Sequence, residues 1–140
     1  MKTLSLIIAL LLTVTFTNAQ EAEKGKSITV NIDKLQSNSG HVLISLHTEN
    51  TFMKGNGIVD KKSKIVDGKV SVTFENVEEG TYAILVLHDA NDNNQMDFEP
   101  NGMPKESFGA SNNSMSFGPP QFSMAKFDVD DEDLEMKIIL

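Results

Sequence analysis

The sequence predicts an all-β protein, namely a single antiparallel β-sandwich of about seven strands. Short runs of alternating apolar and polar residues recur along the chain, and turn-forming residues separate them. No segment repeats its apolar residues with the 3.6-residue period of a helix. The 140 residues include no cysteine, so a hydrophobic core must hold the fold, alone or with a bound ion.

The first 19 residues have the features of a secretory signal peptide. Lys2 gives a positive start, and residues 4–16 form an apolar stretch shorter than a membrane span. A retained membrane anchor is the alternative, which the length of that stretch disfavours. No cysteine is available for lipid attachment, so we expect an exported chain, periplasmic or secreted, with a flexible lead at 20–26 and the β-sandwich domain at 27–140.

The first strands of that domain are predicted from two-residue alternation. Segments 27–33 and 41–47 each place three apolar side chains on one face. The other face of the first strand is expected to be wet, whereas Leu43 adds some apolar surface to the other face of the second. The sequence Asn-Ser-Gly at 38–40 predicts the turn between them. Residues 48–62 lack a clear period, so we expect an irregular crossing segment there, followed by a short strand at 64–66.

The later strands follow the same logic. Asp-Gly at 67–68 predicts a tight hairpin, because both residues accept positive φ. Segment 70–74 alternates again, whereas 81–88 is apolar on both faces and is therefore predicted to be the central strand. The segments 122–129 and 134–140 are predicted as the last two strands.

The charge of the chain disfavours anionic partners. Cleavage after residue 19 would remove one of the 12 basic residues and no acidic one, which leaves 11 Lys against 20 Asp and Glu, a net charge of −9. There is no arginine. Nucleic acids and anionic membranes both bind through clustered cations, so we expect neither as a partner of the exported chain.

A run of oxygen-bearing side chains follows the predicted central strand, and its spacing is that of a calcium loop with donors at positions 1, 3, 5 and 9. A loop that coils around calcium turns every second side chain inward. Asp92 is out of phase and is expected to face water. The predicted ligands are Asp89, Asn91, Asn93, Gln95 through its backbone carbonyl, Asp97 and Glu99.

Two positions depart from the helix-loop-helix calcium pattern. Position 6, normally Gly, is Asn94, and asparagine tolerates the left-handed conformation that this position needs. Position 12, normally a bidentate Glu, is Pro100, so a further ligand must come from Glu99, from water or from elsewhere in the fold. The alternative is a polar loop whose side chains cap its own turns. The length of the connection 89–121 favours the calcium interpretation, because a bound ion would order a loop that is unusually long for a compact domain.

Three blocks of the sequence resemble the successive motifs of the exported bacterial family known as domain of unknown function 2141. They are VTFENVEEGTYAILVLHDANDNNQMD, GMPKESFGASNN and FGPPQFSMAKFDV, and they cover about residues 70–129. The resemblance implies an exported β-sandwich of the transthyretin-like or immunoglobulin-like kind, and it implies no activity. The family usually has glycine where this chain has Asn94.

The second half of the long connection has two interpretations. It could form a ligand surface beside the ion, made of Lys105, Glu106, Phe108, Ser111, Asn112 and Asn113. It could instead be structural, with glycine and proline shaping the return path while Phe108, Phe117 and Phe122 plug the end of the sandwich. The structural interpretation is favoured, because such residues in a long loop more often anchor it than bind a ligand.

Three classes of function remain open. A metal-dependent hydrolase would need His41, His47 and His88 to cluster, yet they lack a recognised ligand spacing, and there is no nucleophile motif. We therefore predict a non-enzymatic module with a structural calcium ion. A ligand- or carbohydrate-binding module, with a glycan or cell-envelope protein as partner, would expose Phe98, Phe108 and Phe117, whereas a scaffold would bury these rings.

Overall fold

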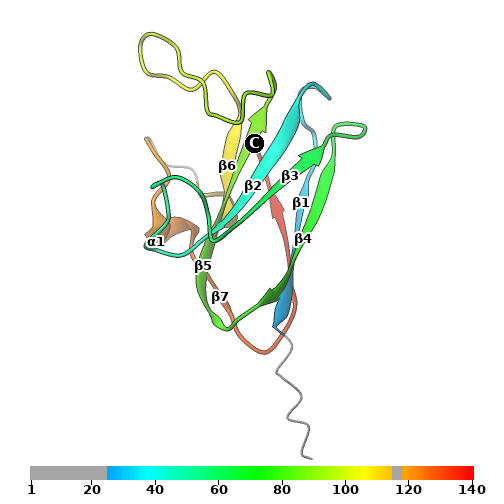
Figure 1. Cartoon of the computed structure of the whole chain (residues 1–140), viewed down its shortest axis with the longest axis vertical. Coiled ribbons are helices and arrows are strands. Elements are labelled where there is room, and N and C mark those ends of the chain that lie inside the picture. The colour runs from blue at the N-terminus through cyan, green and yellow to red at the C-terminus, as the bar shows by residue number, and fades with distance from the viewer. Residues whose placement is uncertain (1–24, 115–117) are drawn as a thin grey trace, which may run out of the picture.

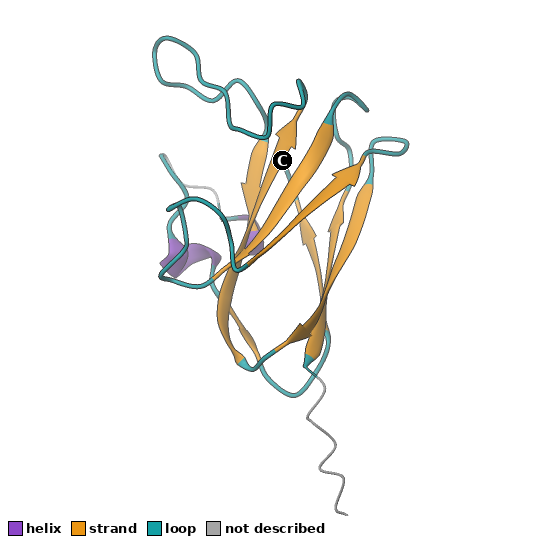
Figure 2. Cartoon of the chain, in the orientation of Figure 1, coloured by secondary structure: helices purple, strands orange, loops and turns teal. Residues whose placement is uncertain are grey.

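Strands dominate the computed structural model, which describes residues 25–114 and 118–140 (Figure 2). The predicted signal peptide lies outside the described residues. Among the described residues, none of the helices is long and apolar enough to cross a membrane. The elements are β1 (Lys26–Ile32), β2 (His41–His47), β3 (Val59–Lys64), β4 (Val70–Val77), β5 (Gly80–Asp89), β6 (Phe108–Ala110), the 3₁₀ turn η1 (Ser111–Asn113), α1 (Phe122–Ala125), β7 (Phe127–Val129) and β8 (Leu134–Ile138).

The strands form two sheets, consistent with the predicted β-sandwich (Figure 1). One sheet has the order β4-β1-β8, and the other has the order β3-β2-β5-β6, with β7 also paired to β5. The prediction of a purely antiparallel fold is wrong at one place, because β1 and β8 pair in parallel. A parallel pair needs a long connection, and here all the other strands lie between its two members along the chain.

The main core fills the space between the sheets. Strands β1, β2 and β5 each contribute three buried residues at every second position, whereas β4 contributes Val70, Phe74 and Val77, with Val72 only partly buried. Burial of these apolar side chains is the main source of stability in a chain without disulfides. The strand members of this core are Ile28, Val30, Ile32, Val42, Ile44, Leu46, Val70, Phe74, Val77, Tyr82, Ile84, Val86, Val129 and Ile138.

Strand β5 is covered on both faces, which confirms its prediction as the central strand. Its even-numbered residues 82–86 face the main core, whereas Ala83 and Leu85 belong to a second apolar cluster on the outer face of the sheet. Phe52, from the segment after β2, and Phe122 of α1 cover that cluster, with their ring centroids 5.6 Å apart.

Three elements differ from their predictions. The short strand expected at 64–66 corresponds to β3, which lies earlier and ends at Lys64. The apolar–polar alternation of β3 is weak, because an edge strand tolerates charged residues. Its Lys61 lies 5.8 Å from the ring of Phe74. Residues 122–125 of the expected strand 122–129 form α1, because they cover the second cluster rather than pair. Strand β6 has only three residues, too few to show a period.

The tight hairpin at 67–68 is confirmed. Val66 and Lys69 pair across it, and Asp67 and Gly68 have φ values of 52° and 68°. Asn38 fixes the hairpin to the turn before β2, because its Oδ1 accepts a hydrogen bond from the Gly68 backbone N–H at 2.9 Å. These two linked turns, each of which connects a strand of one sheet to a strand of the other, therefore join the two sheets at this end.

His47 is buried at the end of β2, under the segment that covers the second cluster. Its ring meets Phe52 edge-on at a centroid distance of 5.8 Å, and its Nδ1 lies 3.2 Å from Thr51 Oγ1. Burial lowers the pKa of His47 below its ordinary value, although a hydrogen bond to Thr51 and the charge of Asp60 partly oppose this. The fold therefore favours the neutral imidazole.

This burial predicts an acid-dependent loss of stability. The unfolded chain takes up a proton on His47 as the pH falls below about 6.5, whereas the folded chain resists it, so the free energy of unfolding should decrease below that pH. Urea unfolding at pH 7.5 and 5.5 measures the loss, and His47→Gln should reduce it. The control is His41→Gln, which changes a less buried imidazole. Equal losses in the wild type and His47→Gln would contradict this assignment.

Candidate functional site

The candidate site lies in the connection between β5 and β6, which projects beyond one end of the two sheets (Figure 1). Strand β5 ends at Asp89, directly opposite His41 of β2. The backbone N–H of His88 also bonds to the carbonyl of Ser107, 2.9 Å away, so the two ends of the connection are held together. The site is therefore built on the end of the central strand.

Asp89 organises the first turn of this connection. Its side chain is fully buried, and its two oxygens accept hydrogen bonds from the backbone N–H groups of Asn93 (3.1 Å) and Asn94 (2.8 Å). A buried carboxylate needs such partners, because it has lost its water. Asn94 has a φ of 61°, which confirms the left-handed conformation expected at position 6.

Two amide side chains converge on Asp97. The Nδ2 atoms of Asn91 and Asn93 both donate to Asp97 Oδ2, at 2.5 and 3.0 Å. Their Oδ1 atoms accept the backbone N–H groups of Asn93 and Gln95, as in Asx turns. A half-turn of either amide group would point its oxygen, instead of its nitrogen, toward Asp97, and would break the bond that this oxygen now accepts from the backbone. The loop thus gathers four predicted ligand residues, including Asp89, around one turn of chain.

Glu106 enters the same loop from its far end. Its Oε1 accepts the backbone N–H of Ala90 (3.0 Å) and its Oε2 that of Asp97 (3.3 Å). Glu99, the predicted ligand, is exposed, and its backbone forms the outer turn with Gly102 and Met103 instead. Glu106 therefore contacts the first part of the connection, whereas Glu99 is exposed on the outer turn. The spacing of the calcium-loop pattern could not predict this contact of Glu106, because the hairpin paired at Asp97 and Lys105 separates Glu106 from the rest of the loop in the sequence.

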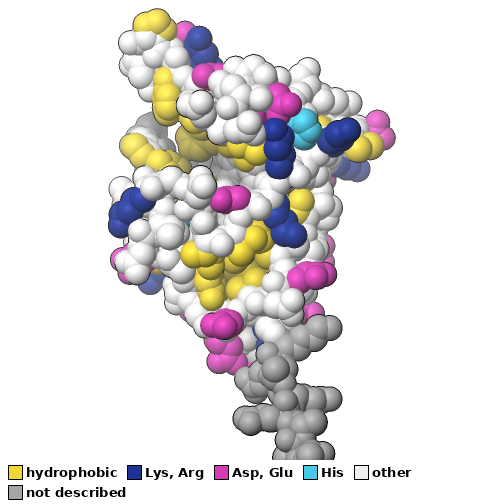
Figure 3. Space-filling view, in the orientation of Figure 1, with side chains coloured by type: hydrophobic (Ala, Val, Ile, Leu, Met, Phe, Trp, Pro, Cys, Tyr) yellow, Lys and Arg dark blue, Asp and Glu magenta, His cyan; other side chains and the backbone are white. Residues whose placement is uncertain are grey.

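Asp92 is exposed, as predicted, and it also contacts the neighbouring strands. Its Oδ1 lies 2.5 Å from Lys62 Nζ and 2.9 Å from His41 Nδ1, and Lys62 also donates to Asn94 Oδ1 at 2.8 Å. Lys62, and to a smaller extent His41, lowers the pKa of the Asp92 carboxyl. These contacts fasten the loop to β2 and β3, where Figure 3 shows a histidine among acidic and basic side chains.

The chemistry of the loop is that of a site for a hard cation. Its donors are carboxylate, amide and carbonyl oxygens, the ligands that calcium prefers. Among residues 25–114 and 118–140, no group of three or more His, Cys, Asp or Glu side chains is arranged to hold a metal ion. A site here would therefore depend on the amide oxygens of Asn91 and Asn93 as much as on carboxylates.

The histidine cluster that a metal-dependent hydrolase would need is absent from the described structure. His88 lies opposite Val42 in the β2–β5 register, whereas His47 lies opposite Ala83, five residues further along β5, or roughly 16 Å. His88 is buried, and its Nε2 lies 2.9 Å from the carbonyl oxygen of Ser39. The described residues therefore do not bring His88 and His47 together across the strands, as the disfavoured hydrolase interpretation would require.

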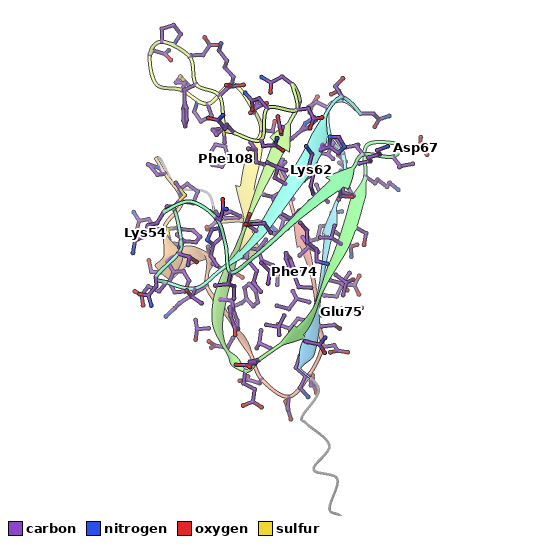
Figure 4. The ribbon with its side chains drawn as sticks, in the orientation of Figure 1. Lys54, Lys62, Asp67, Phe74, Glu75 and Phe108 are labelled. Carbon is purple, nitrogen blue, oxygen red and sulfur yellow. The ribbon has the colours of Figure 1, made fainter. Side chains whose placement is uncertain are left out.

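A β-hairpin forms the outermost part of the connection. The backbone N–H of Lys105 donates to the carbonyl of Asp97 (2.9 Å), and that of Glu99 donates to the carbonyl of Met103 (2.7 Å). Phe98 and Met103 on this hairpin are 58% and 63% exposed. Phe108, at its base in Figure 4, is 37% exposed and does not plug the end of the fold as predicted. Phe117 lies outside the described residues.

Ser111, Asn112 and Asn113, predicted as part of a ligand surface or as structure, all bind the backbone. The buried Ser111 hydroxyl accepts the Ile84 N–H (2.9 Å) and donates to the Ala125 carbonyl (2.5 Å). Asn112 Nδ2 donates to the carbonyls of Met124 and Lys126. These contacts tie η1 to the central strand and to α1.

Asn113 extends the same pattern to β8. Its Nδ2 donates to the Lys137 carbonyl and its Oδ1 accepts the Ile139 N–H, both at 2.8 Å, so its side chain replaces a neighbouring strand. Gly109 allows this closeness, because a Cβ there would lie 2.4 Å from the Ile139 carbonyl oxygen. The three residues are thus structural in their contacts, whereas Lys105 remains exposed beside the hairpin.

Loss of the Ser111 hydroxyl should therefore destabilise the fold. Ser111→Ala leaves the Ile84 N–H and the Ala125 carbonyl without this partner in a buried place, at a cost of about 1–3 kcal/mol. Chemical denaturation gives the value, and Ser123→Ala, which changes an exposed serine of α1, is the control. Equal stability of the two variants would show that the hydroxyl contributes nothing.

Comparison with known proteins identifies a family for this chain. The chain matches a bacterial family described as "Uncharacterized protein conserved in bacteria (DUF2141)" over residues 30–137. No curated protein matches it, and no solved structure does. The match spans both sheets and the whole candidate site, so the chain belongs to the DUF2141 family of bacterial proteins.

Proposed function

We propose that this chain is a non-catalytic, exported module whose 89–106 connection is ordered by a calcium ion. The observation that carries the proposal is the convergence of Asn91, Asn93 and Asp97 within a turn that the buried Asp89 carboxylate holds in place. A polar loop held only by Asx turns does not need two amide side chains directed at a single carboxylate oxygen, which here is Asp97 Oδ2. A cation beside Asp97 would bind all three side chains once both amide groups turn their oxygens toward it.

The proposed ligand set differs from the predicted one at its last member. Asp89, Asn91, Asn93, the Gln95 carbonyl and Asp97 supply five donors, and Glu106 replaces Glu99. Calcium takes about six to eight oxygens at about 2.3–2.6 Å, so the two oxygens of Glu106 would complete the shell. Neighbouring oxygens in such a shell lie about 3 Å apart. The Asn93–Asp97 contact of 3.0 Å would have this spacing if the amide turned and gave up the bond that its oxygen accepts from the Gln95 N–H.

The ion would act on the whole connection. Asp97 and Glu106 flank the two arms of the outer hairpin, whose backbone pairing begins at Asp97 and Lys105. An ion shared by both carboxylates would fix the hairpin relative to the sheets. It would also offset the negative charge of Asp89, Asp97 and Glu106, which otherwise repel one another. Calcium would then supply the order that a chain without cysteine cannot obtain from a disulfide.

Calcium should therefore raise the melting temperature. Binding to the folded state alone stabilises it by about 2.7 kcal/mol at a calcium concentration one hundred times the dissociation constant, which corresponds to a rise in Tm of roughly 10 °C. Thermal melts of the purified protein in calcium, in magnesium and in chelator measure this rise. Identical melting temperatures in calcium and chelator would rule out the proposal.

A matched pair of variants tests the ligand assignment. Glu106→Gln should remove most of the calcium-dependent rise in Tm, because an amide offers one neutral oxygen in place of two charged ones. Glu99→Gln makes the same chemical change on the exposed outer turn and should leave the rise intact. If Glu99→Gln abolishes the effect and Glu106→Gln does not, the original ligand prediction is the better one.

A second candidate function is a binding module for a carbohydrate or an envelope protein. It is favoured by the exposure of Phe98 and Met103 on a projecting hairpin, since a scaffold has no need for apolar side chains there. The ordered hairpin would present these side chains to a partner without a large entropic cost.

Binding through the hairpin has its own test. Phe98→Ser should abolish binding of the protein to a glycan array or to isolated cell envelopes, while the melting temperature changes little because the ring is exposed. Val66→Ser, at an exposed apolar residue of the β3–β4 hairpin, is the control. Absence of binding by the wild-type protein, or equal binding by both variants, would remove this candidate.

A further inference from the structure

A cleft beside the β3–β4 hairpin opens on the outer surface of the three-stranded sheet. Its volume is about 720 Å³, which lies within the range of about 300–1,000 Å³ that is usual for sites of small ligands. Residues of β1, β3, β4 and β8 line it, and none of its lining residues belongs to the 89–106 connection. The cleft is therefore separate from the proposed calcium site.

A hydrogen-bonded row of polar side chains crosses the sheet within this cleft. Ile32 and Val70 face the core, so their neighbours Asn31 and Ser71 point outward. The Ser71 hydroxyl donates to Asn31 Oδ1, and Asn31 Nδ2 donates to Glu135 Oε1, both at 2.7 Å. These bonds fix the three side chains, yet the Asn31 amide keeps a second hydrogen, and Glu135 Oε2 has no partner in the described part of the chain. The row can therefore bond to a ligand without rearrangement.

The two walls of the cleft carry opposite charge. On the β3–β4 wall, Lys64 and Lys69 are exposed, and no ion pair engages either of them among the described residues. On the β8 wall, Glu135 is exposed, whereas Lys137 and Asp33 form an ion pair at 2.5 Å and neutralise each other. The bond to Lys137, and to a smaller extent the charge of Lys69, lowers the pKa of the Asp33 carboxyl, so this carboxyl stays ionised at neutral pH. Two lysines on one wall thus face one unpaired carboxylate on the other.

We propose that this cleft binds a short peptide with free termini, its carboxylate at Lys64 and Lys69 and its ammonium group at Glu135. Such a zwitterion matches both walls, whereas a simple anion would be repelled by Glu135 and a simple cation by the lysines. Asn31, between the walls, offers its amide to the peptide backbone. This site is independent of the proposed calcium ion, and its ligand belongs to a different chemical class.

The width of the sheet sets the length of the peptide. Glu135 of β8 and Lys69 of β4 lie on either side of β1, so two strand spacings, or roughly 10 Å, separate them across the sheet. An extended chain covers at most about 3.3–3.6 Å per residue, so about three residues reach both walls. The long lysine side chains cover the remaining offset along the strands. The exposed Val66, which also lines the cleft, adds an apolar contact for small side chains of the peptide.

Amide NMR titrations with four forms of tri-alanine test the proposal. The forms are the free peptide, the N-acetylated peptide, the C-amidated peptide and the doubly blocked peptide. We expect the free peptide to shift the resonances of Asn31, Lys69 and Glu135 in a saturable way, with a dissociation constant of about 1 mM. Each single block should weaken binding about threefold, because it removes one exposed charge contact. Equal affinity for all four forms, or no saturable shift with the free peptide, would overturn the proposal.

Two variants assign the ends of the peptide. Lys69→Gln should weaken binding of the free and acetylated forms about threefold but not that of the amidated form, which has no carboxylate to lose. Glu135→Gln keeps an oxygen for Asn31 and should weaken binding of the free and amidated forms but not that of the acetylated form. Both side chains are exposed, so both variants should keep the fold.

The control for these variants is Lys54→Gln. Lys54 is an exposed lysine that lies on the opposite side of the view from Asp67 at the tip of the β3–β4 hairpin (Figure 4). Its substitution should leave the affinity for all four peptides unchanged. A loss that is the same for every peptide form, or one that Lys54→Gln reproduces, would overturn the proposal.

Discussion

The burial of β5 on both faces is the constraint on which the rest of the structure depends. Apolar side chains on one face join the main core, while Ala83 and Leu85 on the other face need the cover of Phe52 and Phe122. Since such a strand must be central, its end is fixed between neighbouring strands. This places the Asp89 carboxylate in a buried position, where only hydrogen bonds from the following turn compensate for its lost hydration.

The long connection after β5 divides into two parts with different tasks. Its first part, from Asp89 to Glu106, is polar and projects from the fold, and its carboxylates and amides hold one another and the backbone. Its second part, around η1, returns the chain to the sheets, where Ser111 and Asn113 replace missing backbone partners. Ser111, Asn112 and Asn113 are thus structural in their contacts, whereas the proposed cation site lies before them.

Much of the fold could be predicted from the sequence because alternation and burial are local signals. The central strand at 81–88 and the hairpin at 67–68 were predictable for this reason. The helical turn at 122–125 was not predictable, because its apolar residues cover a cluster formed by residues that are distant in the sequence. The same distinction applies to the site: the left-handed Asn94 follows from spacing along the chain, but Glu106 reaches the loop only through the hairpin that precedes it.

The central claim is that Asp89 holds a preformed turn which binds one calcium ion together with Glu106. A titration followed by amide NMR tests it most directly, because each residue reports separately. The account predicts that one equivalent of calcium shifts the resonances of residues 89–97 and 106 in a saturable way, while those of residues 99–103 follow only weakly. Shifts that are absent at millimolar calcium, or that magnesium reproduces equally at the same concentration, would contradict it.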